Sequence, residues 1–310
     1  MSGELAAAIV VVLVVGALAA TGMTARWVVG HPERIRAGLA WVADRPAVAW
    51  VRSRYPRQWR FLGRRFAPGE AAGLTLTLGV ATVLALGVSF GELLDNVLEG
   101  EGIAVADRPV LRFLAEHRQP WSVTAARVIS DIGSPVGAAV TAVVVGVALS
   151  WARRSWLPLL VFALGAGGIG VINMTVKRLV SRSRPPLDTA VLGEQGFSFP
   201  SGHTVGTTVV WLLSAWMVGH WVISGRAVGV AVWTGALLMI AMVGATRVYL
   251  GVHFPSDVLA GWALGAAWAA TIALVVNVWE QSGRTLTDSS VGPRTNSSTT
   301  IGSTTTGTGG

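Results

Sequence analysis

The chain has 310 residues, of which 52% are hydrophobic and only 13% are charged. Since soluble domains carry about 25% charged residues, this composition excludes an ordinary soluble protein and predicts a membrane protein. The chain contains no cysteine, which excludes disulfides and thiolate metal sites. Its net charge of +8 is placed beside predicted membrane spans, so we relate it to membrane orientation and expect no nucleic-acid partner.

Seven windows are apolar enough to cross a bilayer, whose core of ~30 Å needs ~20 apolar residues in a helix. They are 5–22, 72–90, 135–151, 156–176, 204–223, 227–246 and 258–279. They predict an all-α, polytopic membrane helical bundle with a six-span core at 72–279 and one extra N-terminal transmembrane helix. We interpret residues 1–22 as an uncleaved anchor, because a secretory signal would start with positive charge and this segment starts with Met-Ser-Gly-Glu.

Residues 23–71 are predicted to form an arginine-rich cytoplasmic linker. Ten arginines lie between Arg26 and Arg65, against two acids, Glu33 and Asp44. A dense arginine segment beside a span marks the cytoplasmic side of a membrane protein. The linker can also contact anionic lipid headgroups. The alternative is a solvated basic linker that only fixes orientation.

The alternation of spans after this linker predicts which face each loop reaches. Arg153, Arg154 and Arg226 fall in cytoplasmic loops, as the positive-inside rule requires, and the more acidic loop 91–134 falls outside. We expect that loop to form two or three short amphipathic helices near the outer surface. The tail at 280–310 is rich in Ser, Thr and Gly and is expected to be disordered.

Three short segments carry a concentrated set of charged and catalytic-type side chains. They are Lys177-x6-Arg184-Pro185, Pro200-Ser201-Gly202-His203 and Arg247-x5-His253-x3-Asp257. Lys177 is also the only lysine in the chain. The predicted topology places all three segments on the outer face, within reach of a lipid headgroup.

The residue types of these segments suit the binding of a phosphate group. Arg184 and Arg247 can each grip two phosphate oxygens with a planar fork, and Lys177 adds a point charge. Ser201 and Gly202 stand at the start of a span, where backbone N–H groups and the helix dipole can cradle an anion. The alternatives are interfacial basic side chains that reach for water and an ordinary serine-capped helix start.

His253 and Asp257 are four residues apart, and a helix is predicted to begin near Phe254. Asp257 in its first turn can reach back to His253, fix the tautomer of the ring and raise its nucleophilicity. His203 can protonate a leaving oxygen. The alternative for His253 and Asp257 is a metal-binding pair. Three neighbouring cations would repel a divalent ion, so we expect no metal and no cofactor.

Two glycine patterns lie inside apolar spans. Gly165-x-Gly167-x2-Gly170 matches a dinucleotide fingerprint, but no strand precedes it. We interpret this pattern and Gly261-x3-Gly265 as small-residue packing surfaces between helices.

The three charged segments closely resemble the signature of the type 2 phosphatidic acid phosphatase superfamily, which is Lys-x6-Arg-Pro, Pro-Ser-Gly-His and Ser-Arg-x5-His-x3-Asp. Every charged and catalytic position matches, and Thr246 stands where the family usually has Ser. The resemblance covers about residues 72–278. The sequence Asp131-Ile132-Gly133-Ser134 also looks similar to the family.

This resemblance implies roles for the matched residues. His253 would be the nucleophile that forms a phosphohistidine, Asp257 would activate it, and His203 would protonate the leaving group. The phosphoryl group would be held by Lys177, Arg184, Ser201, Gly202 and Arg247. Members of this kind need no metal.

We therefore expect an integral, multi-pass cell-membrane enzyme with an extracytoplasmic active site that hydrolyses a lipid phosphate monoester or diphosphate. By the resemblance, the substrate classes are phosphatidic acid, phosphatidylglycerol phosphate and polyprenyl diphosphates. One alternative is a phosphotransferase that passes the phosphoryl or headgroup to an acceptor alcohol. Another is a transporter of an anionic lipid or ion, which would need polar residues within spans that have almost none. The oligomeric state is not fixed by the sequence.

Overall fold

A computed structural model describes residues 53–56 and 71–289, except residues 187, 189, 192 and 224. The predicted N-terminal anchor, most of the arginine-rich linker and the part of the tail beyond Ser289 lie outside the described residues. The described part of the chain consists of helices and their connections and contains no strand, which confirms the all-α prediction.

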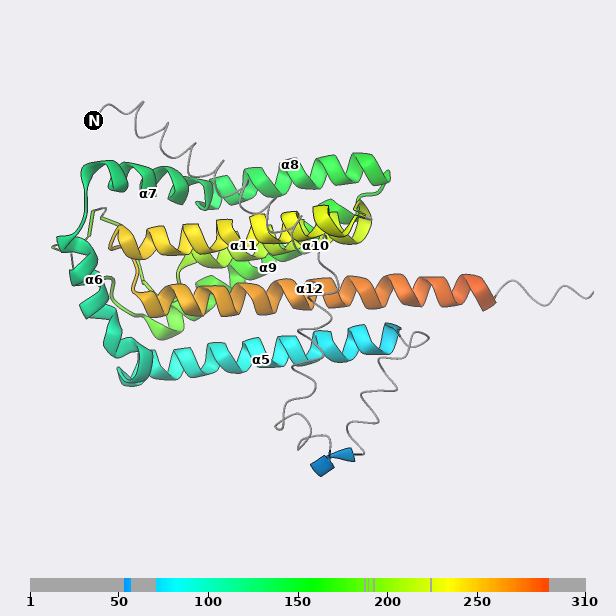
Figure 1. Cartoon of the computed structure of the whole chain (residues 1–310), viewed down its shortest axis with the longest axis horizontal. Coiled ribbons are helices and arrows are strands. Elements are labelled where there is room, and N and C mark those ends of the chain that lie inside the picture. Colours follow the sequence, from blue (N-terminus) through cyan, green and yellow to red (C-terminus); the bar gives the residue numbers. More distant parts are fainter. Residues whose placement is uncertain are drawn as a thin grey trace, which may run out of the picture.

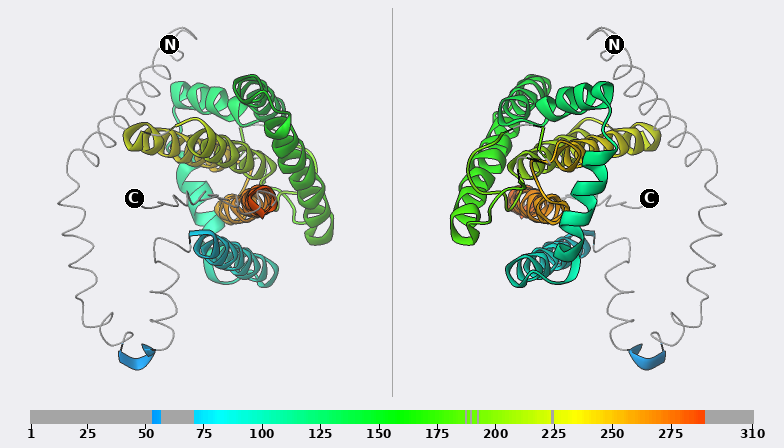
Figure 2. Two further views of the ribbon diagram at one scale, coloured as in Figure 1. Left: turned by 90° about the vertical axis from the view of Figure 1, so that its right-hand side faces the viewer. Right: turned by 90° about the vertical axis from the view of Figure 1, so that its left-hand side faces the viewer.

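Six long helices and a group of shorter ones make up this part of the chain (Figure 1). The long helices are α5 (Ala71–Glu99), α8 (Pro135–Arg153), α9 (Leu157–Val180), α10 (Gly202–Trp221), α11 (Arg226–Tyr249) and α12 (Pro255–Ser289). The short ones are the 3-10 helix η1 (Gly102–Ala106), α6 (Asp107–Glu116) and α7 (Pro120–Ile132). The long helices run alongside one another, and an end-on view shows α6 lying across one end of the bundle (Figure 2).

Each of the six windows predicted after residue 71 corresponds to one long helix. Five of these helices, α5, α8, α9, α11 and α12, are long and apolar enough to cross a membrane, so the chain is a multi-pass membrane protein. The sixth, α10, is less apolar because its buried side chains include Thr204, Thr207, Thr208 and Ser214. Since α10 packs against α8, α9, α11 and α12, its polar side chains face other helices.

Two predicted boundaries differ from the structure. The helix that starts at Ala71 continues to Glu99, so residues 91–99 belong to α5 and not to a separate surface helix. Its acidic side chains Glu92 and Asp95 are exposed and therefore do not interrupt it. The last helix continues to Ser289, past the predicted tail boundary at 280. At that boundary Glu280 is held by His220 and Trp221, and residues 281–289 contain no proline that would interrupt the helix.

Small residues set the closest helix contacts in the bundle. A Cβ atom on Gly265 of α12 would lie 2.8 Å from Thr208 Cβ and 2.9 Å from the carbonyl oxygen of Val205, both on α10. A Cβ atom on Gly165 of α9 would lie 2.5 Å from Leu213 of α10. Gly261 and Gly265 therefore form a packing surface against α10, as predicted. Of the pattern on α9 only Gly165 does so, because a Cβ atom at Gly167 or Gly170 would meet nothing within 4 Å.

Candidate active site

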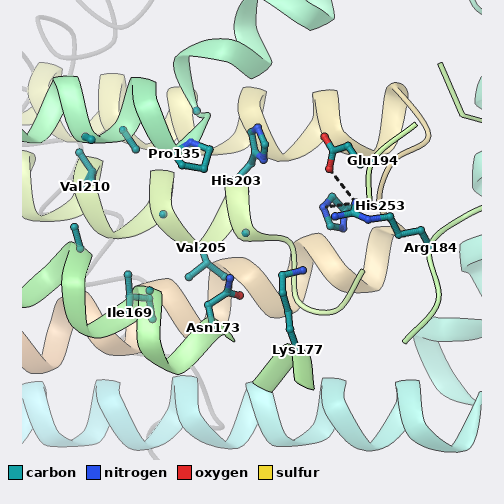
Figure 3. Close-up of a pocket in the computed structure, with 17 residues that line it drawn as sticks. Pro135, Ile169, Asn173, Lys177, Arg184, Glu194, His203, Val205, Val210 and His253 are labelled. Carbon is teal, nitrogen blue, oxygen red and sulfur yellow. Dashed lines mark hydrogen bonds and ion pairs between the residues drawn. The ribbon is translucent and has the colours of Figure 1, made fainter. Parts of the chain in front are cut away.

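The three charged segments converge at the end of the bundle that α6 crosses. Lys177, Arg184, Gly202, His203 and His253 line one cavity of about 380 Å³ (Figure 3). The other predicted residues, Ser201, Arg247 and Asp257, are buried beside it. The structure thus brings together side chains that are as far apart in the sequence as residues 177 and 257.

Helix ends position these side chains. Lys177 lies in the last turn of α9, Arg247 in the last turn of α11, and Asp257 in the first turn of α12. Ser201 directly precedes α10, but within the described part of the chain its hydroxyl makes no capping bond to that helix. It accepts a hydrogen bond from the hydroxyl of Thr204 at 2.9 Å. The site does not match the alternative of an ordinary serine-capped helix start.

The geometry of His253 selects one tautomer of the ring. Its Nε2 atom lies 3.3 Å from Nη1 of Arg184, which can only donate, so Nε2 is the accepting nitrogen. Its Nδ1 atom lies 3.3 Å from Oδ2 of Asp257 and is therefore the protonated nitrogen that donates to the carboxylate. Burial lowers the pKa of His253 to about 4, although the hydrogen bond and charge of Asp257 raise it. The imidazole is therefore neutral near pH 7, with a lone pair on the nitrogen nearest Arg184.

Both carboxylate oxygens of Asp257 are engaged by hydrogen-bond donors. Oδ2 accepts from His253 and from the backbone N–H of Phe254 at 3.0 Å, and Oδ1 accepts from Nη1 of Arg182 at 2.6 Å. Among the described residues, no three side chains of the metal-binding types gather in one place. The Asp257 carboxylate thus bonds to His253, Phe254 and Arg182, while the other ring nitrogen of His253 lies beside Arg184.

Lys177 and Arg184 are held by backbone carbonyl groups of the loops between α9 and α10 and between α11 and α12. Lys177 Nζ donates to the carbonyl oxygens of Phe197 at 2.6 Å and Ser198 at 3.3 Å. Arg184 donates to the carbonyl oxygens of Gly196 at 3.2 Å and Val252 at 2.9 Å. These bonds fix the two cations at the cavity wall and leave the other donors of each group for an anion.

Glu194 is a site residue that the sequence patterns did not identify. It forms an ion pair with Nη1 of Arg184 at 3.0 Å (Figure 3). It forms a second with Nη2 of Arg247, so one carboxylate bridges the two predicted phosphate-binding arginines. Burial raises the pKa of Glu194, but the charges of Arg247 and Arg184 and the hydrogen bond from Arg247 outweigh it and hold that pKa below its usual value. Only its position on the loop between two signature segments could have suggested this role.

The end of α7 supports the site from a second direction. Nη1 of Arg247 donates to the hydroxyl of Ser130 at 2.6 Å, and Thr207 of α10 donates to the carbonyl oxygen of Gly133 at 3.2 Å. Gly133 lines the cavity, and a Cβ atom there would lie 2.3 Å from Val243. The stretch Asp131-Ile132-Gly133-Ser134 therefore has a definite place in the site.

Apart from Asn173 of α9, the rest of the cavity lining is apolar. Away from the charged end the cavity is lined by Ala138 and Ala139 of α8, Ile169 of α9, and Val205 and Val210 of α10. A molecule with a phosphate at one end and hydrocarbon beside it matches this division of the cavity wall.

Comparison with known proteins assigns the chain to a family. The model of the PAP2 superfamily matches residues 155–281. A phosphatidylglycerophosphatase B from Bacillus subtilis is 30% identical over 178 residues, which make up 56% of this chain and 84% of that protein. A decaprenylphosphoryl-5-phosphoribose phosphatase from Mycobacterium tuberculosis is 33% identical over 158 residues, which make up 50% of this chain and 80% of that protein.

A solved structure extends this likeness to three dimensions. The crystal structure of a transmembrane PAP2-type phosphatidylglycerolphosphate phosphatase from Bacillus subtilis matches with a TM-score of 0.58 and 27% identity. The match covers 65% of this chain and 96% of that one.

Proposed function

The chain belongs to the PAP2 superfamily and is a phosphatase of lipid phosphates; from this premise we propose that it works without a metal ion, through a phosphohistidine on His253, at the outer face of the membrane. The observation that carries the proposal is the arrangement of His253, whose Nε2 lone pair lies beside Arg184 while Asp257 holds its Nδ1 proton.

The reaction proceeds in two displacements. A phosphate bound by Lys177, Arg184 and Arg247 has its negative charge stabilised by fixed cations. The Nε2 lone pair of His253 then forms the N–P bond as the P–O bond to the lipid breaks, and His203 gives its proton to the leaving oxygen. Water next attacks phosphorus and gives a proton to His203, which restores its acid form. The N–P bond breaks, its electron pair returns to Nε2 of His253, and inorganic phosphate leaves.

The apolar wall of the cavity supports a lipid as the leaving group. The residues of α8, α9 and α10 that line it would contact hydrocarbon next to the scissile bond. The relatives are named for a phosphatidylglycerophosphate and for a decaprenyl-linked phosphate. We therefore propose a phosphate monoester or diphosphate of a glycerolipid or polyprenol as the substrate class.

The distribution of charge supports the outer face. Arg153 ends α8, Arg154 follows it, and Arg226 starts α11, all at the end of the bundle opposite the site. These positions suit the cytoplasmic side. Because the chain has no cysteine, single cysteines can test this directly. In intact cells, an impermeant maleimide is expected to label Glu116→Cys beside the site and to spare Val222→Cys at the other end; the reverse pattern would overturn the orientation.

The chemistry is tested with purified full-length protein and a panel of lipid phosphates in the presence of chelator. His253→Ala is expected to abolish phosphate release, while His117→Ala, which alters an exposed histidine, retains it. Undiminished activity of His253→Ala, or loss of wild-type activity in chelator, would contradict the proposal. Adding acceptor alcohols distinguishes hydrolysis from the phosphotransferase alternative, which would yield a new phosphate ester.

The role of His203 needs a separate test. His203→Ala is expected to lose most of its activity on an alkyl phosphate, whose leaving oxygen needs a proton, and much less on p-nitrophenyl phosphate, whose leaving group departs as a stable anion. Equal losses on the two substrates would remove His203 from the role of general acid.

A further inference from the structure

A second buried carboxylate is linked to the nucleophile through one arginine. Arg182, two residues before Arg184, donates from Nη1 to Oδ1 of Asp257 at 2.6 Å and from Nη2 to Oδ2 of Asp107 at 2.7 Å. Asp107 is only 1% exposed, although it belongs to the acidic stretch expected at the outer surface. With the bond from His253 to Asp257, these contacts form a continuous series of hydrogen bonds from α6 to His253, the proposed nucleophile.

Ser256 adds hydrogen bonds to two members of this series, Asp107 and Arg182. Its hydroxyl donates to Oδ2 of Asp107 at 2.5 Å, and its backbone N–H donates to Oδ1 of Asp107 at 3.0 Å. Arg182 Nη1 also donates to the hydroxyl of Ser256 at 2.8 Å. Ser256 directly precedes Asp257, which orients His253. The carboxylate of Asp107 therefore holds both the backbone next to Asp257 and Arg182, the cation that pairs with Asp257.

The order of charges in the hydrogen-bonded series Asp107, Arg182, Asp257 and His253 has a consequence for the reaction. Arg182 paired with Asp257 alone would cancel the negative charge that faces the imidazole. Asp107 balances Arg182, so the set of Asp107, Arg182 and Asp257 keeps one net negative charge beside His253. When Nε2 bonds to phosphorus, the ring becomes positively charged and that negative charge stabilises it.

We propose that Arg182 and Asp107 are positioning residues for the nucleophile: Arg182 holds the plane of the Asp257 carboxylate, and Asp107 preserves its net charge toward His253. This inference rests on the proposed phosphohistidine mechanism. It assigns to α6 a function in the chemical step, although α6 contributes no residue to the cavity wall described above.

The test uses purified full-length protein with Asp107→Asn, Arg182→Gln and the double variant. We expect each single variant to lower kcat about tenfold, while the inhibition constant of inorganic phosphate stays within about twofold because Lys177, Arg184 and Arg247 are unchanged. In the double variant the net charge facing His253 is restored, so its loss of kcat is expected to be smaller than the product of the two single losses.

Matched controls remove one charge of the same sign nearby. Glu116→Gln alters an exposed acid on α6, and Arg178→Gln alters an exposed arginine at the end of α9. Both are expected to retain wild-type kcat. If Asp107→Asn fails to fold, Ser256→Ala removes the bridging hydroxyl without a change of charge and is expected to lower kcat about threefold.

Rapid quenching of the reaction distinguishes failure of the positioning role from failure of the proposed phosphohistidine mechanism. The wild type is expected to accumulate acid-labile phosphohistidine, and the Asp107 and Arg182 variants to form it more slowly. If no variant changes kcat, or if phosphate affinity falls in parallel with kcat, the positioning role is wrong. If the wild type forms no phosphohistidine at all, the proposed function fails together with this inference.

Discussion

Glu194→Gln provides the most informative single substitution, because Glu194 and a phosphate group would bind the same donors. One carboxylate pairs with Arg184 and Arg247, the two forks predicted to grip phosphate. A substrate phosphate must displace this carboxylate and also overcome its negative charge. Glutamine keeps the shape of the side chain but removes the charge, so the variant is expected to bind phosphate more tightly than the wild type.

The magnitude follows from the exposure of the pair. A hydrogen bond to a charged group contributes about 1.5–3 kcal/mol when it is buried. The side chain of Glu194 is 27% exposed, so water screens part of this interaction. We take about 1–2 kcal/mol for the loss of both ion pairs, which corresponds to an affinity for phosphate about 5–30 times higher.

The assay is competitive inhibition of lipid phosphate hydrolysis by inorganic phosphate at constant ionic strength. Asp188→Asn is the matched control, because Asp188 is an exposed acid on the same loop. The inhibition constant is expected to fall in Glu194→Gln and to stay constant in Asp188→Asn. An inhibition constant that is unchanged or higher in Glu194→Gln would refute the competition between carboxylate and phosphate.

Three further predictions address other parts of the site. The pKa of His253 is about 4 in the folded protein and about 6.5 in the unfolded chain. Between these pH values the unfolded state binds more protons, so the free energy of unfolding falls as the pH is lowered from 6.5 to 4. His253→Asn should lack this component, about 2 kcal/mol between pH 7 and 5, and its thermal midpoint in detergent should depend less on pH; an unchanged dependence would contradict the shift. Gly261→Ala places a Cβ atom 3.2 Å from the carbonyl oxygen of Ser201 and is expected to lower both the thermal midpoint and kcat. Gly235→Ala, where a Cβ atom meets nothing within 4 Å, should change neither, and equal effects of the two variants would disprove the close-packing argument. Ser130→Ala removes a hydrogen bond to Arg247 and is expected to weaken inhibition by inorganic phosphate about fivefold, for a loss of about 1 kcal/mol; unchanged inhibition would show that Ser130 does not position the arginine.

The sequence predicted those features that depend on local patterns. Apolar windows located the long helices, because each helix must match the thickness of the bilayer by itself. The spacing of His253 and Asp257 placed both on one turn, and the structure shows the expected contact. The helix boundary at Glu99 was missed, since exposed acids at a helix end carry no signal of where the helix stops.

The unpredicted part of the site depends on contacts between distant segments. Asp107 meets Ser256 across 149 positions, Arg247 meets Ser130 across 117, and Arg182 meets Asp257 across 75. A single sequence does not show which acidic residue will face which arginine until the helices are packed. Arg182 lies two residues before the signature residue Arg184, but the sequence around it does not indicate that its partners are Asp107 and Asp257.

The close approach of α10 and α12 at Gly261 and Gly265 makes the α10 wall of the cavity less tolerant of change than the opposite wall. The backbone of α12 lies directly against α10 at these glycines, so neither helix can shift without moving His203 or Asp257, which are proposed to take part in the reaction. The opposite wall, from α8 and α9, meets the cavity mainly through side chains such as Ala139 and Ile169. If the proposed function holds, lipid preference can be redesigned at apolar positions of α8 and α9 such as Ala139 and Ile169, while Lys177 and the groups on α10 and α12 stay in place.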